Sequence, residues 1–333
     1  METRKVQVTG GSTFTVSIPK DWATENDVEA GDRLAFYPQE DSLVVSPGDT
    51  DEKSEGTIDI TDLHGESLTR TVMTMYVSGF DVMVLESNRI DAEQRQAIRS
   101  ATQSLVGLEV IEETGDHVVI QDLLDSSELS VHNAVTRMRL IALSMLEDAV
   151  TAICENDDSL AEDVIERDDD VDRLWFMVSR IFRATLRTPK AAEELGIPRE
   201  ICFDYHSSAR QLERIADHAA KMAQHARELG EIPPAVAEPL AELHHDADGV
   251  VNTAMDALLM DETDRAMDLA NEAREQVREI DQHTRRVDDR IRDLDAQQAQ
   301  LLGLVVDSLS RTADYGGNIA ETALQKAAPR PEK

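Results

Sequence analysis

The sequence predicts a multidomain α+β protein in which small β-containing domains precede a long helical region. Three patterns support this fold class. Residues 4–47 alternate apolar and polar side chains between turn residues, which is typical of short strands. Residues 56–128 alternate strand-like and helix-like segments, and from residue 129 onward apolar residues recur at steps of three and four, as in amphipathic helices. We expect four structural parts, at residues 1–48, 56–128, 129–232 and 233–328.

The composition is strongly acidic, with a net charge of −34 over 333 residues. A hydrophobic content of 41% and sustained apolar periodicity exclude an acidic disordered chain, because disorder goes with low hydrophobicity. We interpret the acidity as adaptation to a salt-rich, halophile-type cytoplasm, where ions screen repulsion between like charges. Two cysteines, no signal-peptide pattern and no run of about 18 apolar residues predict a cytoplasmic protein without a disulfide framework or a membrane span.

The first part contains four strand-like segments, RKVQVTG, TFTVSIP, RLAFYP and SLVVSP, with a helical turn in WATENDV. A domain of this size buries too little surface to be stable alone, so we expect a homodimer. The run from Arg4 to Lys20, with Trp22-Ala23 and the VEAGD segment ending at Asp32, resembles the AbrB/MazE/SpoVT family. The resemblance implies a swapped-hairpin β-barrel shared by two chains, which in many members binds promoter DNA. On this resemblance, the residues expected to contact DNA phosphates are Arg4, Lys5, Lys20 and Arg33; the alternative is a domain that only dimerises.

The second part follows an acidic, turn-rich linker, GDTDEKSEG. Its segments, from TIDITDL to HVVIQDL, predict the order β-α-β-α-β-β and hence a small α/β layer. No Gly-rich loop follows a strand, so nothing indicates a nucleotide site. We interpret this part as a structural or dimerising spacer.

The remaining parts predict an all-α bundle. The expected helices lie at 130–156, 159–187, 200–229, 235–260, 262–298 and 300–326. Pro233-Pro234 divides them into two similar groups of three.

Two acidic pairs within these helices have the spacing of one helical turn. Asp168 and Asp172 lie in VIERDDDVDRL, and Glu213 and Asp217 lie in QLERIADHAAKM. Residues four apart on a helix point the same way, so packing of the two helices would bring four carboxylates to one surface. Such a set suits Mg or Mn, with Fe or Zn if a histidine or water joins. The alternative is that these acids are merely solvated, since the chain has 67 Asp and Glu residues.

His218 directly follows Asp217 in the second of these helices. Neighbouring helix positions point about 100° apart, so we expect a second-shell or surface histidine rather than a ligand. His244 and His245 are interpreted as exposed helix residues, although the acids beside them would also allow stray cation binding. Trp175, Phe176 and Met177 are interpreted as packing on the bundle core.

The first helical group resembles the PhoU family. The resemblance is carried by MLEDAV from Met145, VIERDDDVDRL from Val164, Asp204-Tyr205, and QLERIADHAA from Gln211. It implies two three-helix repeats whose acidic motifs hold metal, in some members as iron or zinc clusters. Together with the N-terminal match, the chain is similar to archaeal phosphate-uptake regulators. The partners implied are components of a phosphate ABC transporter or other phosphate-signalling proteins.

The second helical group departs from that pattern. Alignment by eye places Arg274 and Arg278 where the first group has Asp168 and Asp172. Ser310 likewise replaces Glu213, whereas Asp314 matches Asp217. Guanidinium groups cannot bind a cation, so we expect one metal site or none. An Arg278–Asp314 salt bridge would replace the second site, unless a shifted alignment brings Asp281 or Asp288 there instead.

Three classes of function follow from these observations. The leading one is a phosphate-signalling regulator with a metal-stabilised bundle. A metal-dependent hydrolase is not expected, because no histidine base, nucleophile or basic clamp is placed beside the acids. The third is a dimeric interaction scaffold or transcription factor without a metal site.

Overall fold

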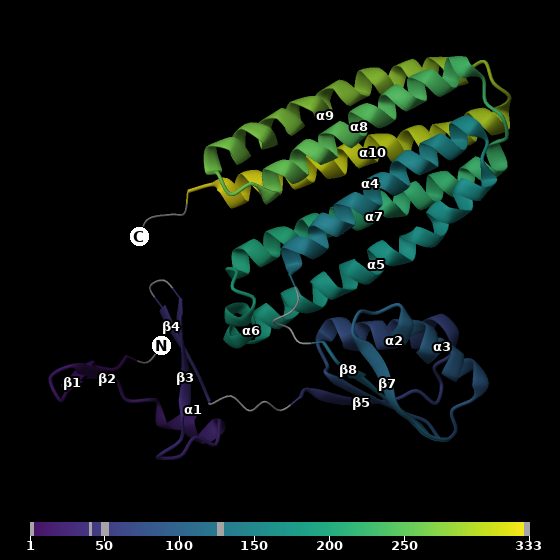
Figure 1. Ribbon diagram of the computed structural model, residues 1–333. Coiled ribbons are helices and arrows are strands. Elements are labelled where there is room, and N and C mark those ends of the chain that lie inside the picture. The colour runs from purple at the N-terminus through teal and green to yellow at the C-terminus, as the bar shows by residue number, and fades with distance from the viewer. Residues whose placement is uncertain (1–2, 40–41, 48–52, 125–129, 330–333) are drawn as a thin grey trace. The chain divides into compact units, whose positions relative to one another are not determined.

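The computed structural model describes residues 3–39, 42–47, 53–124 and 130–329 (Figure 1). The chain divides into two compact units, Met1–Glu52 and Lys53–Lys333. Strands dominate the first unit, and long helices dominate the second. The mixed α+β class predicted from the sequence is therefore confirmed. The predicted boundary at 128/129 and much of the predicted linker lie outside the described residues.

The first unit consists of two antiparallel hairpins and a short helix. Its elements are β1 (Gln7–Thr9), β2 (Thr13–Thr15), α1 (Lys20–Glu25), β3 (Leu34–Gln39) and β4 (Ser42–Pro47). Gly10 and Gly11 turn the first hairpin with φ angles of +66° and +81°, a conformation that glycine adopts without a Cβ clash. All four strands lie in the segments that the alternating pattern predicts.

None of the described residues of this unit is buried. Val8 is 62% exposed and Phe14 is 75% exposed, although both lie on paired strands. Phe36 and Leu43 are exposed in the second hairpin as well. The unit therefore has no hydrophobic core of its own, as expected for so small a segment.

The second unit begins with an α/β domain whose element order is the predicted one. Its elements are β5 (Glu55–Asp59), α2 (Gly65–Ser78), β6 (Val82–Glu86), α3 (Ala92–Gln103), β7 (Leu108–Glu113) and β8 (His117–Asp122). The sheet has the order β5-β6-β8-β7, in which only the β5–β6 pair is parallel. Its core includes Val72 and Tyr76 of α2, Leu85 of β6, Ile98 of α3 and Ile120 of β8.

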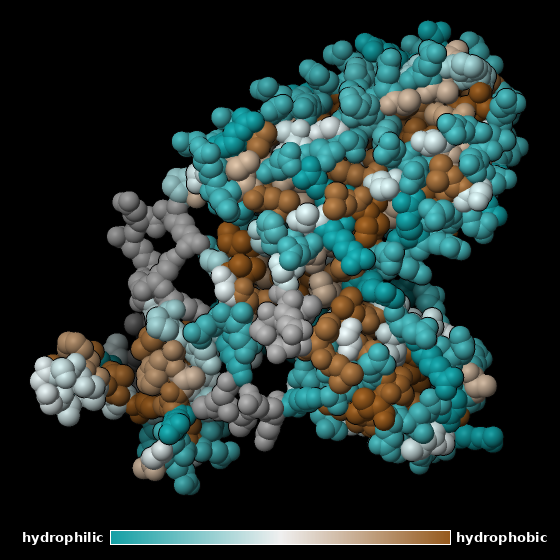
Figure 2. All heavy atoms as spheres, viewed as in Figure 1, coloured by the Kyte–Doolittle hydropathy of each residue, from teal (hydrophilic) through white to brown (hydrophobic). Residues whose placement is uncertain are grey.

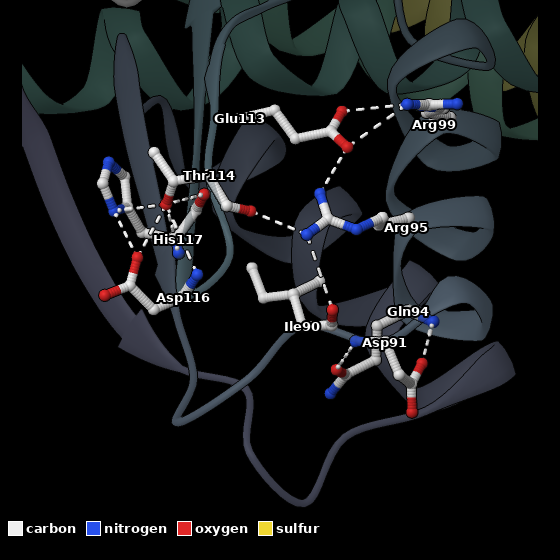
Figure 3. Close-up of polar contacts among 9 residues, drawn as sticks. All are labelled: Ile90, Asp91, Gln94, Arg95, Arg99, Glu113, Thr114, Asp116 and His117. Atoms are coloured by element: carbon white, nitrogen blue, oxygen red, sulfur yellow. Dashed lines mark hydrogen bonds and ion pairs between the residues drawn. The ribbon is translucent and has the colours of Figure 1, made fainter.

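Polar contacts tie α3 to the turn between β7 and β8 (Figure 3). Arg95 and Arg99 of α3 both contact the Glu113 carboxylate, and Arg95 Nη2 also donates to Thr114 O at 2.7 Å. Asp91 caps α3 by accepting from the Gln94 backbone N–H at 2.8 Å. These contacts join the helix layer of the domain to its sheet.

Seven helices follow within the described residues. They are α4 (Val131–Glu155), α5 (Asp158–Arg187), α6 (Pro189–Glu194), α7 (Arg199–Leu229), α8 (Pro234–Leu259), α9 (Thr263–Ile291) and α10 (Ala296–Ala327). The six long ones run side by side, and α7 packs on α4, α5 and α10 (Figure 1). One hydrophobic cluster continues through all six. The two predicted groups of three therefore share a single core.

Three helix boundaries differ from the predicted ones. The Thr188–Pro189 break starts a short extra helix, α6, because Thr188 Oγ1 accepts from the Ala191 N–H and Pro189 suits the first turn. Helix α9 ends at Ile291 instead of 298, and α10 begins at Ala296 instead of 300. Asp295 causes this earlier start, since its carboxylate accepts the N–H groups of Gln297 and Gln298.

Hydrophilic residues cover much of the bundle face shown in Figure 2, in keeping with the acidic composition. Throughout the described ranges, no helix has both the length and the apolar character that a membrane crossing requires.

Candidate metal centre

Helices α5 and α7 bring the two acidic pairs to one surface. The apolar residues of both helices, such as Val171 and Leu212, are buried in the bundle core. Their burial determines which side of each helix is turned away from the core. Asp168 and Asp172 then lie beside their α7 counterparts. Every pair among the four carboxylates is close enough for one charge to shift the pKa of another. These mutual effects on pKa agree with the predicted convergence of Asp168, Asp172, Glu213 and Asp217, here called the carboxylate quartet.

Burial and repulsion between neighbouring acids raise the pKa of Asp168, Asp172 and Glu213. Burial, followed by the charges of Asp168, Glu213 and Asp217, raises the pKa of Asp172 to about 7. Burial and the Asp217 charge raise the pKa of Asp168 to about 6, and Lys221 opposes this only in part. Burial also raises the pKa of Glu213, against the pull of Arg210. Negative charge on these three carboxyl groups is therefore unfavourable in the folded protein.

Glu213 is the most buried member of the quartet, with 8% of its surface exposed. Its Oε1 accepts from Arg210 Nη1 at 2.5 Å, whereas its Oε2 is buried and has no hydrogen-bond partner. Asp217 pairs with Lys221 at 3.5 Å on the exposed side. A buried carboxylate oxygen without a partner is unfavourable, and a bound cation would satisfy it.

The quartet fits a divalent cation by donor type and charge rather than by closed geometry. All of its donors are carboxylate oxygens, which suit hard cations. As the side chains are placed, no three His, Cys, Asp or Glu residues of the described chain surround a common metal position. Binding would require the carboxylates to turn toward a shared ion.

His218 points away from the quartet. Its Nδ1 lies 3.0 Å from Ser308 Oγ, and its Nε2 lies 3.3 Å from the Tyr315 hydroxyl, both on α10. Burial lowers the pKa of this histidine, which favours the neutral ring. The expectation that it is not a direct ligand agrees with this placement.

The equivalent place in the second helical group holds no Arg278–Asp314 pair among the described ion pairs. Arg274 instead lies 3.9 Å from Glu321. Asp314 has a raised pKa, caused by burial and by the charges of Asp281 and Asp307. The predicted Arg278–Asp314 salt bridge does not form among the described residues, and the charge of Asp281 contributes to the raised pKa of Asp314.

A second group of potential ligands includes His245 and an adjacent acid, where the sequence allowed stray cation binding. Glu242, His245, Asp246 and His283 line a hollow of about 610 Å³ between α8 and α9, and His283 Nδ1 contacts the Asp246 carboxylate. His283 lies on α9, and only the packing of α9 on α8 brings it next to Asp246. His244, expected to be exposed, is partly buried, and its Nε2 has no hydrogen-bond partner.

The basic residues expected to contact DNA are all exposed in the first unit. Arg4 and Lys5 precede β1, Lys20 begins α1, and Arg33 precedes β3. The structure gives each of them access to solvent.

Comparison with known families places two domains on this chain. The family model described as PhoU domain matches residues 135–226, which span α4, α5 and most of α7. The model described as antidote-toxin recognition MazE, bacterial antitoxin, matches residues 7–53. The first match contains the whole carboxylate quartet, and the second contains Lys20 and Arg33.

Two curated proteins and two solved structures are similar to this chain. Two proteins of Xylella fastidiosa, from strains 9a5c and Temecula1, are each named phosphate-specific transport system accessory protein PhoU homolog. Both are 28% identical over 196 residues, which cover 57% of this chain and 80% and 79% of theirs. The crystal structure of PhoU from Pseudomonas aeruginosa aligns with a TM-score of 0.51 and 25% identity, over 60% of this chain and 96% of that one. The crystal structure of the phosphate transport system regulatory protein PhoU from Streptococcus pneumoniae aligns with a TM-score of 0.47 and 20% identity. This alignment covers 58% of this chain and 91% of that one.

Proposed function

We propose that this chain, a homologue of the PhoU-family proteins, is a non-enzymatic regulator of phosphate transport. The relatives are accessory proteins of a phosphate-specific transport system, and the alignment covers four fifths of their length. The residues that match the PhoU domain model lie in the helical bundle. Its regulatory surface would act on components of a phosphate transporter or on other phosphate-signalling proteins.

A divalent cation at the carboxylate quartet would set the shape of the bundle. Asp168 and Asp172 would hold it from α5, and Glu213 and Asp217 from α7. The observation that supports this proposal is the unpaired, buried Glu213 Oε2 inside a cluster of carboxylates with raised pKa values. An ion of Mg, Mn, Fe or Zn would remove the repulsion between α5 and α7.

Phosphate uptake by cells that lack the gene tests the regulatory proposal. Cells grown at high phosphate would take up labelled phosphate faster than the parent, because transport is no longer restrained. Reintroduced wild-type protein would restore the parental rate, and an Asp168→Ala/Glu213→Ala variant would not. An unchanged uptake rate in the deleted cells would contradict the proposal.

The first unit would supply dimerisation through an intertwined, swapped-hairpin barrel. The match to a MazE-type domain and the exposed apolar side chains Val8, Phe14, Phe36 and Leu43 support this. A second chain would cover these side chains and provide the core that one chain lacks.

Promoter binding is a further proposed role of this unit. It rests on the exposed cations Arg4, Lys5, Lys20 and Arg33, which stand out on an acidic chain. In gel-shift assays with DNA from its own promoter, the wild type would bind and an Arg4→Glu/Lys20→Glu variant would not, although it stays dimeric. Equal binding by the two proteins would rule out these phosphate contacts.

One observation favours an alternative function, that of an interaction scaffold without a metal site. No three candidate ligands in the described chain surround a metal position as placed. In this alternative the carboxylate quartet contributes only surface charge. Removing it would leave phosphate regulation unchanged.

A further inference from the structure

Helix α5 carries Asp168 and Asp172 of the carboxylate quartet on one face and contacts the α/β domain with the adjacent face. The contacts to the domain come from a stripe formed by Arg173, Phe176, Arg180 and Arg187. At 100° per residue, this stripe lies about a quarter turn from Asp168 and Asp172. One rigid helix therefore connects the candidate metal centre with the α/β domain.

Arg180 is the main connection between α5 and the domain. Its guanidinium donates to Tyr76 O at 2.8 Å and Phe80 O at 3.0 Å, and it pairs with Asp81 at 2.9 Å and Asp122 at 2.8 Å. It also lies 5.0 Å from the centre of the Tyr76 ring. The Arg180 and Asp122 side chains are each only 11% exposed. Because the guanidinium is planar and has five N–H donors, Arg180 can bind helix α2, the turn that follows it and the end of β8 at the same time.

Other contacts extend this connection along α5. Phe176 packs against the core of the α/β domain, not on the bundle core as the sequence suggested. Arg173 donates to the Gln103 carbonyl at the end of α3. Near the end of α5, Arg187 lies so close to Gly79 that a Cβ there would be 1.9 Å from its Nη2. The stripe thus makes polar and apolar contacts to the α/β domain over about four helical turns of α5.

The α/β domain is built to move as one body. Its own hydrophobic core is closed, and the network around Glu113 joins α3 to the sheet (Figure 3). The Tyr76 hydroxyl donates to Val106 O at 3.0 Å, and the Val106 side chain packs against the bundle core. In the chain, this domain directly follows the first unit.

We propose that the α/β domain is the relay through which the bundle reports cation binding, and that Arg180 is its positioning residue. The proposal rests on the cation site suggested above. Without a cation, repulsion separates the carboxylates of α5 from those of α7; with one, α5 moves toward α7. Because Arg180, Phe176 and Arg187 fix the domain to α5, that movement displaces residues 53–124. The displacement would then reach the first unit through the chain.

Hydrogen exchange of the full-length protein, with and without MnCl₂, tests this relay. In the wild type, Mn²⁺ would change exchange rates in α2 and β5 by about fivefold or more, in addition to changes in α5 and α7. Arg180→Lys keeps the charge but loses the forked geometry, so the change in α2 and β5 would disappear. Its affinity for Mn²⁺, measured by titration calorimetry, would stay the same.

Two further variants make the outcome decisive. Asp122→Asn weakens the same connection from the domain side and would also reduce the Mn²⁺ response of α2. Arg183→Lys, on the same helix but outside the stripe, would respond like the wild type. If the wild type binds Mn²⁺ while α2 and β5 exchange unchanged, the relay is wrong and the cation site stands. If no Mn²⁺ binds, both proposals fail together.

Discussion

Replacing Asp172 by asparagine should stabilise the metal-free protein at neutral pH. The wild-type carboxyl has its pKa raised from 3.8 to about 7 by burial and by four neighbouring acids. Between these pH values the folded state binds more protons than the unfolded state, so stability falls as pH rises through this window. Asparagine has the same shape but carries no charge, and it avoids this loss.

The size of the effect follows from the raised pKa. Each unit corresponds to about 1.4 kcal/mol, so about three units give an upper value of about 4 kcal/mol. Asp172 is partly exposed, and solvent screening reduces the expected gain to about 2 kcal/mol at pH 8. At pH 4 the wild-type group is already protonated in the folded state, and the gain should nearly vanish.

Urea unfolding of the helical bundle, followed by circular dichroism in low-salt buffer with a chelator, measures this gain. Asp170→Asn serves as the matched control, because Asp170 is exposed on the same helix and should change stability by less than about 0.5 kcal/mol. A destabilised Asp172→Asn protein at pH 8, or an equal gain at pH 4 and pH 8, would refute the electrostatic reasoning.

Three more substitutions test other parts of the structure. Phe14→Glu places a charge on the exposed apolar surface of the first unit and should convert a dimer to a monomer in light scattering; a persistent dimer would exclude this surface as the interface. Arg180→Met leaves Asp122 buried without its partner and should lower the free energy of unfolding by about 3 kcal/mol. A loss below about 1 kcal/mol would show that the contacts of Arg180 contribute little to stability. Asp295→Ala removes the cap of α10 and should destabilise the bundle by about 1 kcal/mol in the same urea assay, whereas no change would assign the α10 start to packing alone.

The parts of this structure that depend on local periodicity could be predicted from the sequence. The bounds of α5 and α7 fall within a residue of the expected ones, because their apolar residues repeat regularly and prolines flank them. The i, i+4 rule then placed each acidic pair on one face. Only the packing of two long helices was needed to bring the pairs together. The same geometry explains why His218, one position further on, turns to α10.

Features that depend on contacts between distant segments could not be predicted in this way. Nothing in the local sequence distinguishes Arg180 from other arginines of the bundle; its role appears only when Asp81 and Asp122 fold against it. Phe176 was assigned to the wrong core because periodicity shows that a residue is buried but not against which domain.

Metal analysis of protein purified without a nickel column tests the proposed cation site most directly. Elemental mass spectrometry would measure the metal content of the wild type and of an Asp168→Ala/Glu213→Ala variant. Circular dichroism would verify that both proteins are folded. We predict about one tightly held divalent ion per wild-type chain and none in the variant. A folded wild type without any divalent ion, or equal metal content in the two proteins, would contradict a metal centre between α5 and α7.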